Sequence, residues 1–253
     1  ALHDLAGIVG IPVQAVSLNG TLGLAFGARG HGWASAHYEP GTVVINLTKT
    51  RGAGALAHEW FHALDHYFQG KRGDSTGIFI TESPEPYYVN ASGHRLSVSR
   101  FEVLRDRGNI NDEAEWKKVT GVRPEVATAF AEVVARLNAS PMAQRSALID
   151  KGRGKGYWSK VLERAARAFE GYVIHRMRRE GIHNDYLANV VGEEEFARNP
   201  EMYPYLRESE LEPVVAALDS LFETMETRET ESGVELYRDV SESVKKADRA
   251  SLR

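Results

Sequence analysis

Cysteine is absent from the 253 residues of this chain. Its absence excludes a disulfide-stabilised scaffold, a thiol nucleophile and a zinc site built from thiolates. Any metal ion must therefore be bound by histidine, aspartate or glutamate side chains. A chain without cysteine is also compatible with a reducing compartment.

Long hydrophobic runs are missing as well. No stretch approaches the roughly 20 apolar residues that a membrane-spanning helix needs, and the N-terminus lacks the basic and apolar segments of an export signal. We therefore expect no membrane contact and a cytoplasmic location. The chain begins at Ala1 rather than methionine, which is compatible with its being part of a longer protein.

A strong net charge of either sign is also lacking. The formal net charge of -4 provides no broad basic surface for a phosphate backbone, although Lys151, Arg153 and Lys155 form a local basic run. We therefore expect no nucleic-acid partner. The apolar fraction of 42% and the charged fraction of 26% are typical of folded globular proteins.

The order of hydrophobic residues predicts an α+β domain over residues 1–228. After a short amphipathic start, the first 50 residues contain four short β-like runs separated by turn residues, at 13–18, 22–26, 33–38 and 42–47. The period then changes to that of a helix over 54–68, with Gly70 as the signal that ends it. We expect a small twisted sheet packed on this helix.

The second half of the chain predicts mainly helices. Residues 70–97 have the composition of an ordered loop or hairpin with one β-like run at 77–81. Helical periodicity follows at 98–106, 112–118, 124–138, 141–149, 159–179 and 207–227, with a basic, glycine-rich interruption at 151–156. Residues 229–253 are charged and form a candidate mobile tail.

The most informative segment is His58-Glu59-Trp60-Phe61-His62, an H-E-x-x-H motif inside the first long helix. Residues four apart on a helix are offset by only about 40° and rise about 6 Å, so the imidazoles of His58 and His62 converge on one point. Neutral imidazoles are good ligands for Zn²⁺, and Glu59 beside them suits the base that activates a metal-bound water. The alternative is that both histidines merely edge the core and that Glu59 is solvated.

A zinc site needs a third ligand. His66 lies about 12 Å along the helix from His58, too far to share an ion with it, so we expect it to be solvated or to support the ligands. Asp65 could accept the second ring N–H of His62, or form a surface ion pair. Glu163 and Glu170 are better candidates: they share one face of the helix at 159–179, and a small residue between them allows close helix packing. Spacing alone does not separate these two glutamates.

Several segments resemble the first type of large polyvalent protein-associated domain, which occurs in very large proteins of bacteriophages and other mobile elements. The similar segments are 24–30, 44–49, 52–65, 157–160 and 163–173, with weaker similarity at 185–188 and 203–204, so the resemblance extends to about residue 225. This family belongs with the gluzincins, and the segment from Glu163 is similar to the third-ligand helix of anthrax lethal factor. One departure is Val161 after Lys160, where many relatives have proline.

The resemblance implies a zincin-like fold and a zinc-dependent metallopeptidase of a bacterial host cytoplasm. His58, His62 and Glu163 would bind zinc, Glu59 would activate water, and Tyr157 would assist catalysis, with a protein or peptide as substrate. The strand at 33–38 could pair with that substrate as an added strand. The alternatives are an inactive zinc-stabilised binding module, a zinc hydrolase of non-peptide substrates, and, on the basic run alone, a nucleic-acid module. The substrate and the oligomeric state are not predicted.

Overall fold

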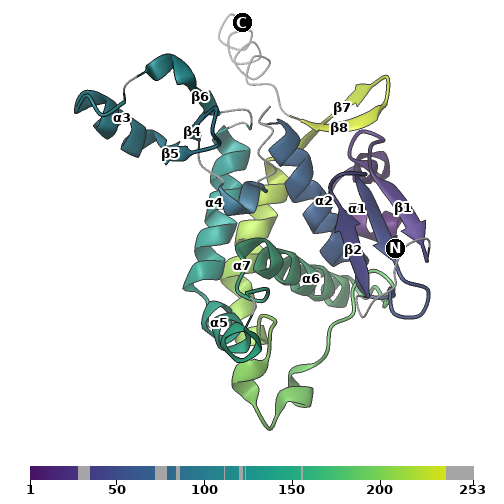
Figure 1. The fold of residues 1–253 in the computed structure, drawn as a ribbon. Coiled ribbons are helices and arrows are strands. Elements are labelled where there is room, and N and C mark those ends of the chain that lie inside the picture. The colour runs from purple at the N-terminus through teal and green to yellow at the C-terminus, as the bar shows by residue number, and fades with distance from the viewer. Residues whose placement is uncertain are drawn as a thin grey trace, which may run out of the picture.

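The computed structural model describes residues 1–27, 35–71, 79–83, 86–110, 112–119, 122, 124–154 and 156–237. These residues form a mixed α+β structure with small sheets around a helical body (Figure 1). The α-helices are α1 (Leu2–Val9), α2 (Leu56–Lys71), α3 (Val98–Asp106), α4 (Pro124–Ala139), α5 (Pro141–Arg153), α6 (Val161–Glu180) and α7 (Glu208–Glu223). The predicted α+β class and the mainly helical second half are confirmed.

The N-terminal sheet consists of β1 (Gly23–Phe26), β2 (Ala36–Glu39) and β3 (Val44–Leu47), in the order β1-β3-β2. Strands β1 and β3 are parallel, whereas β2 and β3 are antiparallel. Both β2 and β3 pack against α2, as predicted from the sequence. Residues 33 and 34 of the predicted third strand lie outside the described residues.

The first predicted strand, at residues 13–18, is wrong. This segment is the 3-10 helix η1 (Val13–Ser17), and it is followed by left-handed backbone at Leu18 (φ 51°) and Asn19 (φ 64°). The indole Nε1 of Trp60 donates a hydrogen bond of 3.0 Å to the Val16 carbonyl. This buried contact ties η1 to α2. Ala15, Val16 and Leu18 face the core rather than a neighbouring strand, whereas Val13 is exposed.

A second sheet projects from the helical body together with α3 (Figure 1). It contains β4 (Tyr87–Asn90), β5 (Arg95–Ser97) and β6 (Trp116–Val119), paired antiparallel in the order β5-β4-β6. The helix predicted at 112–118 is therefore wrong: Asp112 caps the short 3-10 helix η3 (Glu113–Glu115), and β6 follows. The pairing of Trp116 with Asn90 outweighs the local helical pattern.

The loop after α2 contains the 3-10 helix η2 (Ile80–Glu82) in place of the expected β-like run at 77–81. Residues 77 and 78 lie outside the described part of the chain. Ile80 and Thr81 are buried against α2, α4 and α6, so this short segment covers one side of the helical core.

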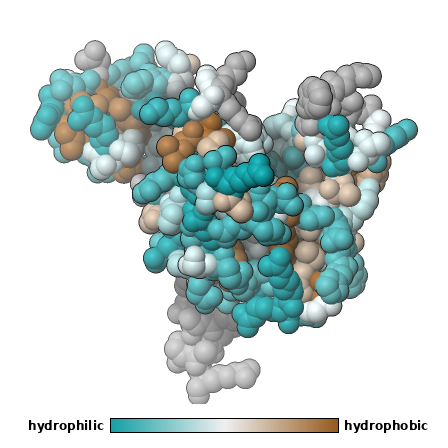
Figure 2. Space-filling view, turned by 90° about the horizontal axis from the view of Figure 1, so that it is seen from below, coloured by the Kyte–Doolittle hydropathy of each residue, from teal (hydrophilic) through white to brown (hydrophobic). Residues whose placement is uncertain are grey.

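Aromatic side chains form the centre of the core. The rings of Phe61 and Phe169 lie 5.0 Å apart, and Trp60, Tyr172 and Phe222 continue the cluster from α2 and α6 to α7. Aromatic pairs at such distances add to the free energy of burial. In the view of Figure 2 the outer surface is mainly hydrophilic, with hydrophobic residues showing as patches between polar ones.

The ends of the predicted helices shift by a few residues. Helix α2 continues through Gly70 to Lys71, so Gly70 is not its C-cap. Helix α5 runs to Arg153 and ends at Gly154, whose left-handed backbone (φ 69°) is the conformation that favours glycine. Lys155 of the basic run lies outside the described residues.

A C-terminal hairpin crosses the predicted domain boundary at residue 228. Its strands are β7 (Glu226–Thr230) and β8 (Gly233–Tyr237), and β8 packs on η1. Asn19 donates its backbone N–H to the Val234 carbonyl, and Leu236 is 2% exposed within the core. The packed domain therefore includes 229–237, the first part of the predicted tail. Residues 238–253 lie outside the described residues.

Among the helices that the structure describes, none combines the length and the apolar composition required to cross a bilayer.

Candidate metal centre

Helix α2 presents the two histidines of the motif from adjacent turns. Its first turn is anchored by the chain segment after α6, since Ala57 donates its N–H to the Leu187 carbonyl. Gly54, just before the helix, has a φ of 87°, and a Cβ there would lie 2.8 Å from Asn189. With this start, the Nε2 atoms of His58 and His62 lie 3.2 Å apart.

Helix α6 brings Glu163 to the same point. One carboxylate oxygen lies 3.5 Å from His58 Nε2, and the other lies 3.7 Å from His62 Nε2. Ala165 and Ala166, beside Glu163, are completely buried, and their small side chains permit close packing of α6 on α2. The three ligand atoms lie within 4.8 Å of one another.

The spacing of these atoms fits a tetrahedral ion. Ligand atoms at bonds of about 2.1 Å around a tetrahedral centre are separated by about 3.4 Å. The two Nε2 atoms lie 3.2 Å apart, close to that value, and each lies 3.5 to 3.7 Å from a different oxygen of the Glu163 carboxylate. His58, His62 and Glu163 therefore form a group that could hold a metal ion.

The charges around the group also suit a cation. Three buried or nearly buried carboxylates, those of Glu59, Glu163 and Glu170, accompany one buried guanidinium, that of Arg167. With neutral histidines negative charge predominates around the group, since the completely buried Asp65 also acts on His62, and a divalent cation would offset part of it. Within the described residues, the buried Oε2 of Glu163 has no hydrogen-bond partner.

The pKa values of the ligands reflect their mutual contact. Burial alone would raise the pKa of Glu163, but the two imidazoles outweigh burial and hold that pKa well below its usual range. Burial alone would lower the pKa of His58, but Glu163 and Glu170 raise it to about 9.

Glu170 contacts His58 from the other side of the ring, with 3.6 Å between its Oε2 and His58 Nδ1. It is 5% exposed, and burial raises its pKa. The choice between Glu163 and Glu170, which spacing left open, is thus made by geometry. Glu163 faces the pair of Nε2 atoms, and Glu170 supports one of the two histidines.

The residues predicted for catalysis lie at the edge of the same group. Glu59 is 7% exposed, and its charge acts on both His58 and Tyr157. Tyr157 is 45% exposed, yet burial of its hydroxyl end, followed by the charge of Glu163 and a hydrogen bond to it, raises the pKa of Tyr157.

Asp65 takes neither of the roles considered for it, and His66 is partly exposed. Asp65 is completely buried and accepts hydrogen bonds from the Thr81 backbone N–H (3.0 Å) and hydroxyl (2.5 Å), which excludes a surface ion pair. It does not bond to His62, whose buried Nδ1 has no partner in the described part of the chain. His66 is hydrogen-bonded through Nδ1 to the Tyr38 hydroxyl at 2.6 Å.

Sequence reasoning missed Arg167 and Tyr205. Arg167 lies four residues after Glu163 and three before Glu170, so helical spacing alone places it on their face. Tyr205 comes from the loop before α7, and burial followed by the charge of Glu170 raises its pKa. No local pattern indicated Tyr205, because its position depends on a distant contact.

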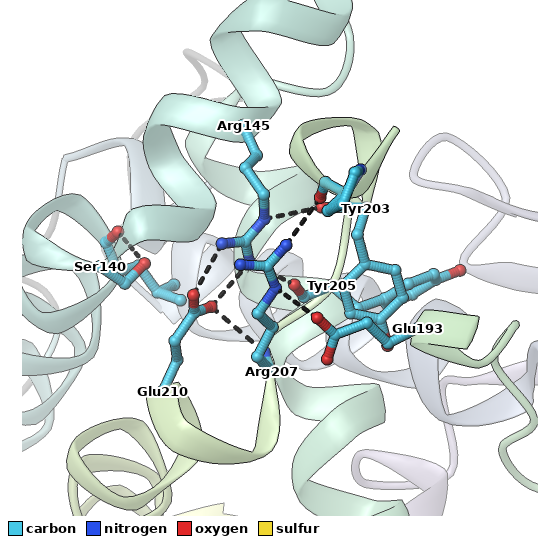
Figure 3. Close-up of polar contacts among 9 residues, drawn as sticks. Ser140, Arg145, Glu193, Tyr203, Tyr205, Arg207 and Glu210 are labelled. Atoms are coloured by element: carbon cyan, nitrogen blue, oxygen red, sulfur yellow. Dashed lines mark hydrogen bonds and ion pairs between the residues drawn. The ribbon is translucent and has the colours of Figure 1, made fainter. Parts of the chain in front are cut away.

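That contact is a clamp around Arg145 of α5 (Figure 3). Its guanidinium donates to both carboxylate oxygens of Glu210, at 2.6 and 2.7 Å. It also donates to the carbonyls of Tyr203 (2.9 Å) and Tyr205 (2.7 Å). Arg207 adds an ion pair of 2.7 Å to Glu193. The clamp thus fixes the loop that carries Tyr205.

The family model of large polyvalent protein-associated domain 1 matches residues 149–229. The match includes Tyr157, Glu163 and Glu170, but not the motif of α2, and it begins far later than the resemblance expected from the sequence. No curated protein and no solved structure matches the chain.

Proposed function

We propose that this chain is a zinc-dependent metallopeptidase with His58, His62 and Glu163 as its metal ligands. The observation that carries the proposal is the convergence of His58, His62 and Glu163, whose ligand atoms lie within 4.8 Å of one another, with a buried carboxylate, Glu59, next to the first histidine. Two imidazoles and one carboxylate are a ligand set of catalytic zinc sites, which leave a position open.

Zinc bound here would supply a Lewis acid and lower the pKa of a water molecule towards about 7. Glu59 would accept the proton of the attacking water and later deliver it to the leaving amine. The hydroxyl of Tyr157 is protonated at neutral pH, as for an ordinary tyrosine, and its raised pKa keeps it so, so it can donate a hydrogen bond to the developing oxyanion.

A peptide substrate is favoured by the sheet beside α2. Strand β2 lies at the edge of its sheet and packs on the helix that carries the histidines. An extended peptide could add to this edge and lie along the metal centre. The match to a polyvalent protein-associated domain further supports a domain within a polyvalent protein of a phage or mobile element.

The main alternative is a binding module that keeps zinc only for stability. Such a module has no need for Glu59, because three other side chains already supply the ligands. Burial of an additional carboxylate costs free energy, so the presence of Glu59 beside the ligands is better explained by a role in catalysis. The same geometry would serve a zinc hydrolase of non-peptide substrates, and the proposal for a peptide rests on the edge strand.

The test is the substitution Glu59→Gln, which keeps the size of the side chain but removes its ability to accept a proton. We expect the zinc content and the melting temperature to stay unchanged while proteolysis of a fluorescently labelled casein, and of host proteins in a lysate, falls to background. New protein termini are counted by mass spectrometry. Equal cleavage by the variant and the wild type would show that Glu59 is not the base.

A lysate in which the wild-type protein generates no new termini, despite a full complement of zinc, would favour the binding module. The matched control is Glu180→Gln, at the exposed end of α6 and remote from the motif, which should change neither zinc content nor cleavage.

A further inference from the structure

The backbone amides of the turn that carries Tyr157 all donate hydrogen bonds to one carboxylate. Asp150, near the end of α5, accepts hydrogen bonds from the backbone N–H groups of Tyr157 (3.0 Å), Trp158 (3.0 Å) and Ser159 (2.7 Å). A carboxylate that accepts several backbone N–H groups is strongly favoured in its charged form. Three consecutive amides thereby point at one fixed anion.

A carbonyl of the same turn accepts a hydrogen bond from Arg167 of α6. The guanidinium Nη2 donates to the Trp158 carbonyl at 2.5 Å, and Cζ lies 4.8 Å from the centroid of the Trp158 ring. The Trp158 ring in turn meets the Tyr157 ring edge to face, with 5.5 Å between centroids. The turn is therefore gripped between an anion on α5 and a cation on α6.

Arg167 is an unusual residue to find at this depth. It is 2% exposed, and within the described residues its Nε and Nη1 atoms have no hydrogen-bond partner. A buried charge with few close partners is costly, and the nearby charges of Glu163 and Glu170 offset part of that cost. Arg167 is thus bound electrostatically to the metal group and by a direct hydrogen bond to the turn beside it.

We propose that Arg167 is a positioning residue that holds the hydroxyl of Tyr157 beside Glu163, and this inference rests on the proposed function of the site. Arg167 itself does not touch the reacting atoms in this arrangement. Loss of the guanidinium frees the Trp158 carbonyl and the Trp158 ring that contacts Tyr157. Tyr157 then leaves the metal centre while the three ligands remain.

Hydrogen exchange tests whether Arg167 holds the turn at 157–159, and it needs no substrate. In the whole chain loaded with zinc, Arg167→Met should accelerate exchange of the Tyr157, Trp158 and Ser159 amides at least about tenfold, because these hydrogen bonds then open locally. Amides of α2 should be unaffected. The control is Arg176→Met on the same helix, whose ion pair with Asp219 (3.1 Å) is remote from the turn.

Unchanged exchange at these three amides would overturn the proposal, whatever the activity of the protein. If Arg167→Met fails to fold, Arg167→Lys keeps the charge but not the planar guanidinium, and it should give a smaller acceleration at the same amides. Exchange of Arg167→Lys identical to that of the wild type would count against a role for the guanidinium.

A double-substitution cycle on casein cleavage tests the consequence for catalysis. Loss of one oxyanion donor costs about 100-fold in kcat, so Tyr157→Phe and Arg167→Met should each approach that loss with KM and zinc content nearly unchanged. If Arg167 acts through Tyr157, the double variant should be no slower than Tyr157→Phe alone. Multiplied losses, or loss of zinc from Arg167→Met, would overturn the positioning role.

Failure of the proposed function has a different signature. A wild-type protein that binds no zinc or cleaves nothing refutes the peptidase, whereas the exchange experiment still decides whether Arg167 holds the turn.

Discussion

Glu170 lies 3.6 Å from the Nδ1 atom of His58, on the side of the imidazole opposite the Nε2 atom that faces Glu163. One histidine is thus held between two carboxylates of α6 that are seven residues apart. A carboxylate at the second ring nitrogen fixes the orientation of a metal-binding histidine and raises its basicity. The two glutamates therefore have different tasks although both lie on one face of α6, three residues before and four residues after Ala166.

This arrangement predicts unequal effects on metal binding. Glu163→Ala removes a ligand, and we expect the purified protein to lose its zinc. Glu170→Ala removes only support, and we expect affinity to fall about 10- to 100-fold while one ion per chain still binds at high zinc concentration. Competition with a chromophoric chelator measures both. Equal losses, or a greater loss with Glu170→Ala, would reverse the assignment.

The raised pKa of His58 predicts a dependence of zinc stabilisation on pH. The folded metal-free protein holds this proton more tightly than the unfolded chain, with a pKa of about 9 against 6.5. The proton therefore stabilises the metal-free fold below about pH 6.5, and this stabilisation is lost as the pH rises through about 9. If His58 is a zinc ligand as proposed, zinc has to displace that proton, so we expect its binding to strengthen over the same range.

The measurement is the melting temperature with and without stoichiometric zinc at pH 6.5, 7.5 and 8.5. The increase caused by zinc should grow at each step. An increase that is constant, or that shrinks with pH, would contradict the linkage.

Close packing of α2 and α6 predicts that Ala166 does not tolerate a larger side chain. Ala166→Leu should lower the free energy of unfolding by about 1 to 3 kcal/mol, because the site is fully buried. It should also weaken zinc binding by displacing Glu163.

The control is Ala135→Leu on the exposed side of α4, expected to change stability by no more than about 0.5 kcal/mol. Chemical denaturation and zinc titration report the two effects, and zinc affinity equal to that of the wild type would argue against helix approach as the determinant.

The Arg145 clamp predicts a large contribution to stability. Arg145→Met leaves the buried Glu210 carboxylate and two carbonyls without their donor, and we expect a loss of about 3 to 5 kcal/mol at pH 7. Arg136→Met breaks an exposed pair of the same length, 2.6 Å to Glu132, and should cost no more than about 0.5 kcal/mol. Similar losses in the two variants would contradict the clamp.

The difference between the stability losses of Arg145→Met and Arg136→Met should also depend on pH. Burial alone would raise the pKa of Glu210, but Arg145 outweighs burial and lowers it from 4.5. The contribution of the pair is therefore complete above about pH 4.5 and is lost as the pH falls through the lower pKa of the folded state.

Local sequence was sufficient to predict most helices and two members of the candidate metal-binding group, His58 and His62. The periodicity of 124–138 and 159–179 reports a buried stripe directly, and the spacing of His58 and His62 follows from helical geometry alone. It misled where tertiary contacts outweigh local pattern. Ala15, Val16 and Leu18 are apolar because they are buried in the core, not because they pair as a strand, and 116–119 joins a sheet despite a helical pattern.

The sequence by itself determined that a metal could be bound only by His, Asp and Glu, that the motif lies on a helix, and that a glutamate of a later helix could complete it. These properties follow from composition and from the fixed rise and turn of a helix. Only the tertiary structure decided that Glu163 rather than Glu170 meets the Nε2 atoms, since both share one face and the crossing of α2 and α6 selects between them. The same crossing, together with the end of α5, placed Arg167 and Asp150 around the Tyr157 turn, because contacts between separate elements depend on packing that no local spacing encodes.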